Sequence, residues 1–179
     1  MVTDIRTNRG GFLRPFGCGW FIREFLLGHR PEGAPAIDPD RGAPQTDIRY
    51  HYKAALYRAY ARDGAEREIS RLVLEGVEVT DAMAQRIYER YLRRIPYKLT
   101  KCRYHSFLVY FRMLKQLGWV EATGEVEPSS IQDNYPAAPP RIYYRLTETG
   151  KQAPDWQWSN PQFTLYPHLA LPSSPPATK

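Results

Sequence analysis

The sequence predicts a mainly helical α+β domain with a small β-ribbon and irregular termini. Apolar residues recur at the three- and four-residue spacing of helices through the middle of the chain. Two short runs typical of strands, at 119–122 and 141–146, follow the last of these helical segments. Most of the 16 prolines lie in the first 45 or the last 40 residues. A chain of 179 residues, 42% of them hydrophobic, is therefore expected to have one folded centre with less regular ends.

Residues 1–45 are predicted to form an extended arm with a short helix and a linker rich in proline and glycine. The run "WFIREFLLGHR" has the apolar content of a short helix, which Gly28 would end, with Pro31 just beyond. The following "RPEGAPAIDPDRGAPQ" has the composition of a linker. The apolar side chains of the arm need a buried surface, which is either the central domain or a second copy of the chain.

Residues 46–79 are predicted to be a helical extension. Thr46 is a suitable N-cap for a helix over 47–62, in which apolar or aromatic side chains recur every four residues. The run "RDGA" would interrupt this helix, and a second helix over 65–75 would end at Gly76. The next three residues, "VEV", are predicted to form a short strand.

Three helical segments are predicted at the start of the unit 80–152. Thr80 would cap a helix over 81–94, and Pro96 ends it because the proline ring disfavours helical geometry at the preceding residue. The run "YKLTKC" is predicted to be a short helix or turn. The run "RYHSFLVYFRMLKQLG" has the apolar face of a longer helix, which Gly118 would end.

The two predicted strands would pair as an antiparallel ribbon at the end of this unit. Alternation along a strand places successive side chains on opposite faces. One face of the second strand would carry Ile142, Tyr144 and Leu146, and the other Arg141, Tyr143 and Arg145. The segment 153–179 is a proline-rich tail, and its tryptophan, phenylalanine and leucine residues predict that part of it packs against another surface.

The segment 80–152 resembles a winged helix-turn-helix domain. The resemblance is strongest in "LKQLGWVEATG" and "RIYYRLTETGK", which are similar to the end of a recognition helix and the two wing strands of bacterial and archaeal regulators. PadR-like and MarR-like regulators often end the wing with a phrase similar to "YYRLT..G". The resemblance implies a winged helix-turn-helix core with a recognition helix at about 101–117.

Positive charge is concentrated in one part of the chain. Eight lysine or arginine residues and no aspartate or glutamate lie between Arg90 and Val120, although the net charge of the whole chain is only +6. Such a one-sided basic region is typical of a surface that binds a polyanion.

The resemblance implies three groups of nucleic-acid-binding residues. In a helix-turn-helix, the start of the second helix meets base edges while flanking basic residues contact phosphates. The start of the recognition helix would contribute Thr100, Lys101, Arg103, Tyr104, His105 and Ser106, with Arg112 on the same helix. Backbone contacts would come from Arg93, Arg94 and Lys98, and the wing would contribute Arg141, Tyr143 and Arg145.

The predicted wing tip, 123–140, does not fit this picture. It contains Glu125, Glu127 and Asp133 but no lysine or arginine, and these carboxylates would be repelled by phosphates. We therefore expect the tip to fold back on its own domain or to contact a protein, rather than to enter a minor groove.

The sequence favours no catalytic, metal or cofactor site. Cys102 and His105 have the spacing of two metal ligands, but no second pair follows at zinc-site spacing. Motifs for phosphate-cradling loops, dinucleotides or hydrolytic nucleophiles are absent. The first 30 residues lack a signal-peptide pattern, and two cysteines are too few for a disulfide scaffold. We expect a cytoplasmic protein, associated with the nucleoid if it binds DNA, with no contact to a membrane.

These observations predict a non-catalytic protein that binds duplex DNA, as a transcriptional regulator does. One alternative is a winged-helix module for protein–protein interaction, or a subunit of a larger assembly, with partner surfaces on the arm, the wing tip or the tail. The sequence does not separate DNA from RNA, so a ribonucleoprotein component is a further alternative. A homodimer would use the helix at 47–62 or the arm at 12–29.

Overall fold

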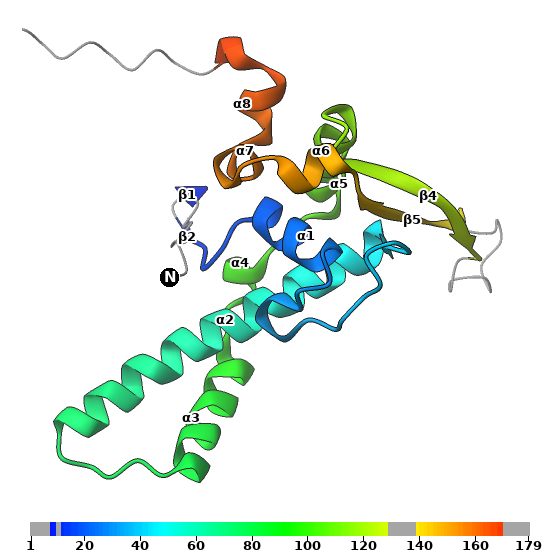
Figure 1. Cartoon of the computed structure of the whole chain (residues 1–179). Helices are drawn as coiled ribbons and strands as arrows, with labels where there is room; N and C mark the ends of the chain where they lie inside the picture. The colour runs from blue at the N-terminus through cyan, green and yellow to red at the C-terminus, as the bar shows by residue number, and fades with distance from the viewer. Residues whose placement is uncertain (1–7, 10–11, 129–138, 170–179) are drawn as a thin grey trace, which may run out of the picture.

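The computed structural model describes residues 8–9, 12–128 and 139–169 (Figure 1). Within them the chain is mainly helical with a small three-stranded antiparallel sheet, which confirms the predicted α+β class. The acidic residue Asp133 of the predicted wing tip and the end of the proline-rich tail lie outside the described residues.

The elements follow one another along the chain in this order: β1 (Asn8–Arg9), β2 (Phe12–Leu13), α1 (Cys18–Leu26), η1 (Pro31–Gly33), β3 (Ala43–Pro44), α2 (Gln45–Leu74), α3 (Asp81–Arg94), α4 (Tyr97–Thr100), α5 (Tyr104–Gln116), β4 (Val120–Glu127), β5 (Arg141–Leu146), α6 (Glu148–Gln152), α7 (Asp155–Ser159), α8 (Pro161–Leu165) and η2 (Pro167–Leu169). The predicted helix over 81–94, the longer helix within the run 103–118, the short helix between them and the antiparallel ribbon are confirmed.

The helix α2 is continuous, so the predicted break at "RDGA" is wrong. It runs for 30 residues from Gln45 to Leu74. Gly64 lies inside it, and a Cβ atom at this position would come within 2.5 Å of the Tyr91 ring on α3. The glycine therefore lets α3 approach α2 closely, and this packing compensates for the ~1 kcal/mol helix penalty of glycine. The predicted N-cap is also wrong, since Pro44 occupies that position and Thr46 lies in the first turn.

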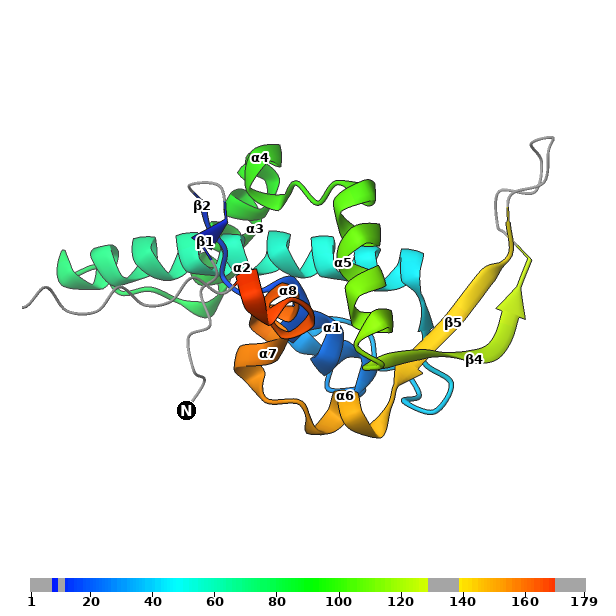
Figure 2. The ribbon, with the colours of Figure 1, turned by 90° about the horizontal axis from the view of Figure 1, so that it is seen from above.

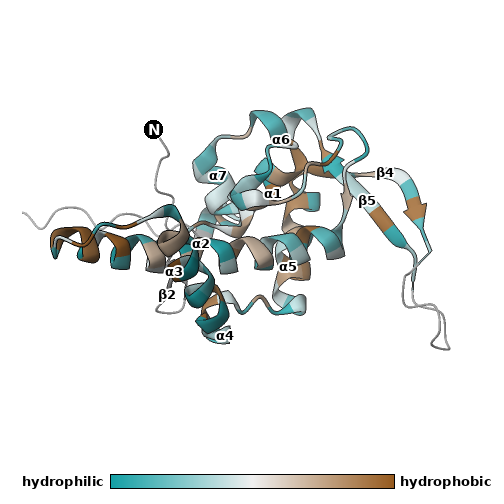
Figure 3. Ribbon diagram, turned by 90° about the horizontal axis from the view of Figure 1, so that it is seen from below, coloured by the Kyte–Doolittle hydropathy of each residue, from teal (hydrophilic) through white to brown (hydrophobic). Residues whose placement is uncertain are grey.

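The long α2 and the shorter α3 form a hairpin that projects away from the rest of the molecule (Figures 1 and 2). The Oγ1 atom of Thr80 accepts the Met83 N–H at 3.3 Å and so caps α3 as predicted. The predicted strand over "VEV" is wrong, because these residues form the irregular turn between the two helices. Three apolar side chains at this end are exposed, Val73 by 57%, Leu74 by 88% and Val77 by 39%, and the end of α2 is coloured as hydrophobic in Figure 3.

The sheet has the strand order β3–β5–β4, and its first strand comes from the predicted linker. Ala43 pairs with Tyr144, which makes the end of the linker part of the domain. Gly42 has a φ of 72°, and a Cβ atom there would lie 2.0 Å from the Tyr144 carbonyl oxygen. A side chain at position 42 would therefore prevent this strand from reaching β5. The strand β4 extends to Glu127, beyond the predicted end at residue 122, with an irregularity between Ala122 and Val126.

One aromatic core joins the arm, the long helix, α5, the sheet and the tail. Phe21 of α1 stacks on Phe25 and contacts Tyr52 of α2, with ring centroids 5.6 and 5.4 Å apart. The tail contributes Trp158, which is 1% exposed and lies 4.8 Å from the Trp119 ring. Thus the arm and part of the tail find their buried surface within the same chain.

Candidate nucleic-acid interface

The short helix α4 makes a tight turn in front of α5, and buried groups hold this turn in place. Thr100 is fully buried, and its Oγ1 donates to the Tyr97 carbonyl oxygen at 3.4 Å. Its predicted contact with DNA is therefore wrong, because the side chain does not reach the surface. Arg49 of α2 donates to the Cys102 carbonyl oxygen at 2.8 Å, and Arg14 donates to the Lys101 carbonyl oxygen at 2.9 Å.

Cations from α2 add to the positive charge at the start of α5. The Arg49 guanidinium lies 5.4 Å from the centre of the Tyr104 ring, and the Lys53 ammonium lies 5.5 Å from the centre of the Tyr97 ring. Sequence reasoning missed both residues, since they precede the acid-free stretch by about 40 residues. Their four-residue spacing places them on one face of α2, but only the tertiary fold shows that this face meets α4 and α5.

The helix α5 has one buried and one exposed face. Phe107, Phe111 and Leu114 are buried in the core. His105, Ser106, Val109 and Arg112 are exposed, and they fall within about one third of the helix circumference at 100° per residue. We call these four residues the α5 outer face. Arg103, which is also exposed, precedes it at the N-cap position, and Tyr104 is 50% exposed in the first turn.

No carboxylate neutralises this region within the part of the chain that the structure describes. Neither Arg103 nor Arg112 forms an ion pair there, and no side-chain hydrogen bond caps the start of α5. The tail helix α8 packs against α5, and Tyr110 donates to the Trp158 carbonyl oxygen at 2.9 Å. The outer face nevertheless stays exposed, because Tyr110 lies on the buried side.

The acid-free stretch continues from α5 back to α3. In Figure 2 the chain runs from the end of α3 through α4 to the start of α5 on one side of α2. Arg93, Arg94 and Lys98 are exposed, and Lys101 is half-buried. Arg93 lies 3.9 Å from Glu89 in a long ion pair, whereas Arg90 donates to Glu68 of α2 at 2.5 Å. This hydrogen bond lowers the pKa of Glu68 below the ordinary value of a glutamate.

The wing arginines are paired with carboxylates, in contrast to the α5 outer face. Arg145 donates to Glu121 at 2.9 Å, and Arg141 forms ion pairs with Asp47 and Glu127. These pairs reduce the charge that the predicted wing contacts could offer to a phosphate.

The third predicted wing residue is covered rather than exposed. Tyr143 is 6% exposed, and its hydroxyl donates to Glu127. The Arg41 guanidinium lies 4.6 Å from the centre of its ring and also contacts Glu125 at 2.6 Å. Arg41 comes from the predicted linker, so the local alternation of β5 could not reveal this cover.

The thiols and acidic groups that the structure describes are not arranged to hold a metal ion. Cys18 and Cys102 form no disulfide within the described residues, both are half-buried, and burial raises the pKa of Cys102. A raised pKa disfavours the reactive thiolate. Across residues 8–9, 12–128 and 139–169, no group of three or more histidine, cysteine, aspartate or glutamate side chains is placed to hold a metal ion.

In the described part of the chain, none of the helices combines the length and the apolar character needed to cross a bilayer. Comparison of the chain with protein-family models, with curated proteins and with solved structures gave no match.

Proposed function

We propose that this chain is a non-catalytic DNA-binding protein of the regulator type, which contacts duplex DNA through the α5 outer face. The observation that carries the proposal is the exposed face of α5, where His105, Ser106 and Arg112 stand beside Arg103 without a carboxylate partner among the described residues. An arginine fork suits the paired acceptors of guanine, and unpaired cations suit phosphates. The uncapped start of α5 would offer its N–H groups to a phosphate.

The packing supports a winged-helix arrangement, although with other elements than the sequence suggested. The core includes side chains of α1, β3, the first part of α2, α5, β4 and β5, but none from α3. The strands β4 and β5 follow α5 directly, and β3, which precedes α2 in the chain, pairs with β5 on the side opposite to β4. We therefore propose that α2 rather than α3 supports the recognition helix, and that the α2–α3 hairpin is an addition to the winged unit.

A salt titration of binding tests this proposal. Fluorescence anisotropy would measure the affinity of the full chain for duplex DNA, single-stranded DNA and RNA between 50 and 200 mM salt. With about six phosphate contacts, duplex affinity should fall on the order of a thousandfold over this range. The proposal fails if duplex binding is absent at 50 mM salt or does not depend on salt. Tighter binding to RNA or to single strands would replace duplex DNA as the proposed partner.

A second candidate function, protein–protein interaction, is favoured by the tail helices. Trp156, Phe163 and Tyr166 are exposed by 63%, 43% and 40%, which is unusual for large aromatic side chains. Together with the neutralised wing, these residues would suit a subunit of a larger assembly. A chain that binds none of the three nucleic acids would favour this alternative.

The surfaces first expected to form a homodimer are used inside the chain. Tyr52 and Leu56 of the helix at 47–62 are fully buried, as are Phe21 and Ile22 of the arm. A homodimer would instead need another apolar surface, such as the exposed residues at the end of the α2–α3 hairpin.

A further inference from the structure

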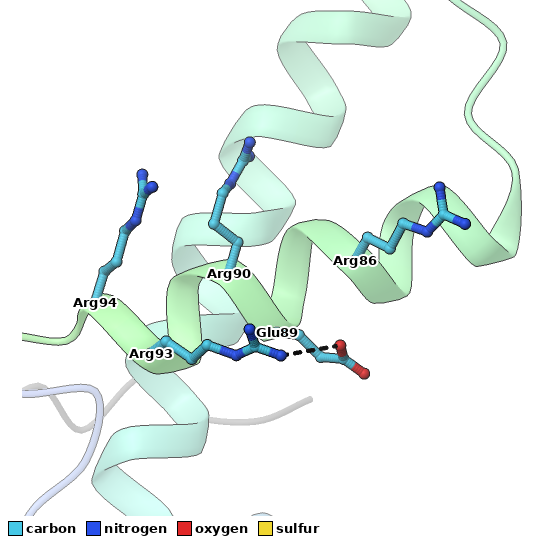
Figure 4. Close-up of a pocket in the computed structure, with 5 residues that line it drawn as sticks. All are labelled: Arg86, Glu89, Arg90, Arg93 and Arg94. Carbon is cyan, nitrogen blue, oxygen red and sulfur yellow. Dashed lines mark ion pairs between the residues drawn. The ribbon is translucent and has the colours of Figure 1, made fainter.

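A hollow of about 310 Å³ lies on α3, outside the α5 outer face, and charged side chains alone line it (Figure 4). The lining residues are Arg86, Glu89, Arg90, Arg93 and Arg94, which we call the α3 hollow. Figure 4 shows Arg86, Arg90 and Arg94 projecting toward the same side of the helix in a row, with the Arg93–Glu89 ion pair beside them.

The helical spacing of the arginines explains this row. Positions 86, 90, 93 and 94 fall within about 100° of the helix circumference, because a residue turns the helix by about 100°. Ile87, which borders this row on the helix surface, is buried with 5% of its surface exposed. The row from Arg86 to Arg94 is about 12 Å long at 1.5 Å per residue, so it can meet more than one phosphate group.

The hairpin holds this row on a fixed support. The Thr80 cap fixes the start of α3, and the Arg90–Glu68 hydrogen bond at 2.5 Å joins it to α2. The close approach of Tyr91 to Gly64 fixes the spacing of the two helices. These contacts hold the backbone of α3 against α2, so the arginines start from defined positions on the hairpin.

The hollow has more positive than negative charge. Four guanidinium groups face two carboxylates, Glu89 of the hollow and Glu68 of α2. Arg86 and Arg94 have no carboxylate partner among the described residues. Like charges at four-residue spacing on a helix repel one another, and an anion with about two negative charges would remove this repulsion.

We propose that the α3 hollow is a phosphate-binding site, which takes a diphosphate or two neighbouring phosphate groups of a larger ligand. Arginine forks donate paired hydrogen bonds to phosphate oxygens, and several forks can share one phosphate. The absence of apolar side chains among the five lining residues favours a compact polyanion over an acidic peptide. A free ligand and a nucleic-acid backbone both supply such phosphates, and the experiments below distinguish them. The site does not depend on whether α5 binds DNA.

Inorganic pyrophosphate is the probe for the first test, carried out on the full chain by isothermal titration and by thermal denaturation. Arg86→Ala/Arg94→Ala should weaken pyrophosphate binding about tenfold and reduce the rise in Tm that the ligand causes. Arg67→Ala/Arg71→Ala is the matched control, since it removes two arginines from the same hairpin that do not line the hollow. This control should bind within about twofold of the wild type.

The lysine variant Arg86→Lys/Arg94→Lys separates arginine geometry from net charge. It should bind pyrophosphate more weakly than the wild type but better than the alanine variant, because an ammonium group keeps the charge without the fork. Circular dichroism of each variant verifies that the exposed substitutions leave the fold intact.

Duplex DNA distinguishes the two sources of phosphate. If the backbone occupies the hollow, Arg86→Ala/Arg94→Ala should lower the salt slope of duplex binding by about 1.8, or 0.9 for each lost contact. An unchanged slope with weakened pyrophosphate binding assigns the hollow to a free phosphorylated ligand. The proposal is overturned if neither changes relative to the matched control, or if poly-glutamate binds the hollow as tightly as pyrophosphate. If the wild type binds pyrophosphate but does not bind duplex DNA, only the function proposed for α5 is contradicted.

Discussion

The α5 outer face and the wing carry the same type of residue, but in different electrostatic states. On the wing, Arg145 lies opposite Glu121 and Arg141 lies opposite Glu127 in the antiparallel register. Cross-strand neighbours of opposite charge attract each other, so these arginines are already neutralised. On α5, Arg103 and Arg112 have no such neighbour in the described chain. A positive side chain therefore becomes a binding group only where the fold keeps carboxylates away from it.

Reversing a charge on α5 should produce the largest effect. Arg112→Glu is expected to weaken duplex binding about a hundredfold at low salt, because it removes a cation and repels phosphates from the same position. Arg67→Glu makes the same charge change on α2, away from α5, and should cost less than about fivefold. Anisotropy titrations measure both affinities. Equal losses would mean that only net charge matters and would abolish the distinction between the two regions.

Removing the carboxylates of the wing should make it more like α5. Glu121→Gln/Glu127→Gln removes the ion pair of Arg145 and one of the two ion pairs of Arg141. Duplex affinity should then rise by up to about tenfold, and its salt slope should become steeper as freed cations gain phosphate contacts. Gel-shift titrations at two salt concentrations check this outcome. An unchanged slope would show that the wing lies away from the bound duplex.

Removing the wing arginines should affect stability more than binding. Arg141→Ala/Arg145→Ala should change duplex affinity by less than about threefold, since the two cations are already paired. It should lower the free energy of unfolding by about 1 kcal/mol, the upper end for ion pairs at a protein surface, because these pairs are partly exposed. Urea denaturation and anisotropy on the same protein measure both quantities. A tenfold loss of affinity at unchanged stability would contradict the neutralised state of the wing.

The smallest expected effect is on the pH dependence of stability, through the ion pair between Arg90 of α3 and Glu68 of α2. Because the hydrogen bond from Arg90 lowers the pKa of Glu68 in the folded state, this pair stabilises the fold above the unfolded pKa of glutamate. The contribution is lost as the pH falls through the lower, folded pKa. Glu68→Gln should therefore reduce stability at pH 7 and flatten its decline under acidic conditions, measured by Tm from pH 3 to 7. Parallel pH profiles for the variant and the wild type would contradict this pairing.

Elements with local signals could be predicted from the sequence, whereas elements formed by distant partners could not. Thr80 marks a helix start because its side chain caps the first turn, and Gly118 marks a helix end because it adopts a positive φ. The alternation of side chains in β5 marks a strand. The sequence predicts a break at Gly64, because the role of this glycine depends on Tyr91, which follows 27 residues later. The strand β3 has only two residues, and its pairing with β5 cannot be inferred from them alone.

In the candidate site too, features with a local signal could be predicted, whereas features set by distant partners could not. The exposure of Arg103, His105, Ser106 and Arg112 follows from helical spacing, because the buried positions of α5 fix the opposite face. The burial of Thr100 depends on how α4 packs, which its sequence does not specify. Likewise, Arg145 is neutralised because the register of β4 and β5 places it opposite Glu121. This register could not be deduced from the sequence without knowing where β4 ends.

The most direct measurement is an amide-resolved NMR titration of the full chain with duplex DNA. We predict the largest chemical-shift changes at residues 103–112, smaller changes along α3 and α4, and the smallest in β4 and β5. Paramagnetic probes on the duplex should broaden the same α5 signals first. Changes confined to the tail helices or the wing, with the signals of α5 unmoved, would contradict the assignment of α5 as the DNA-contacting surface.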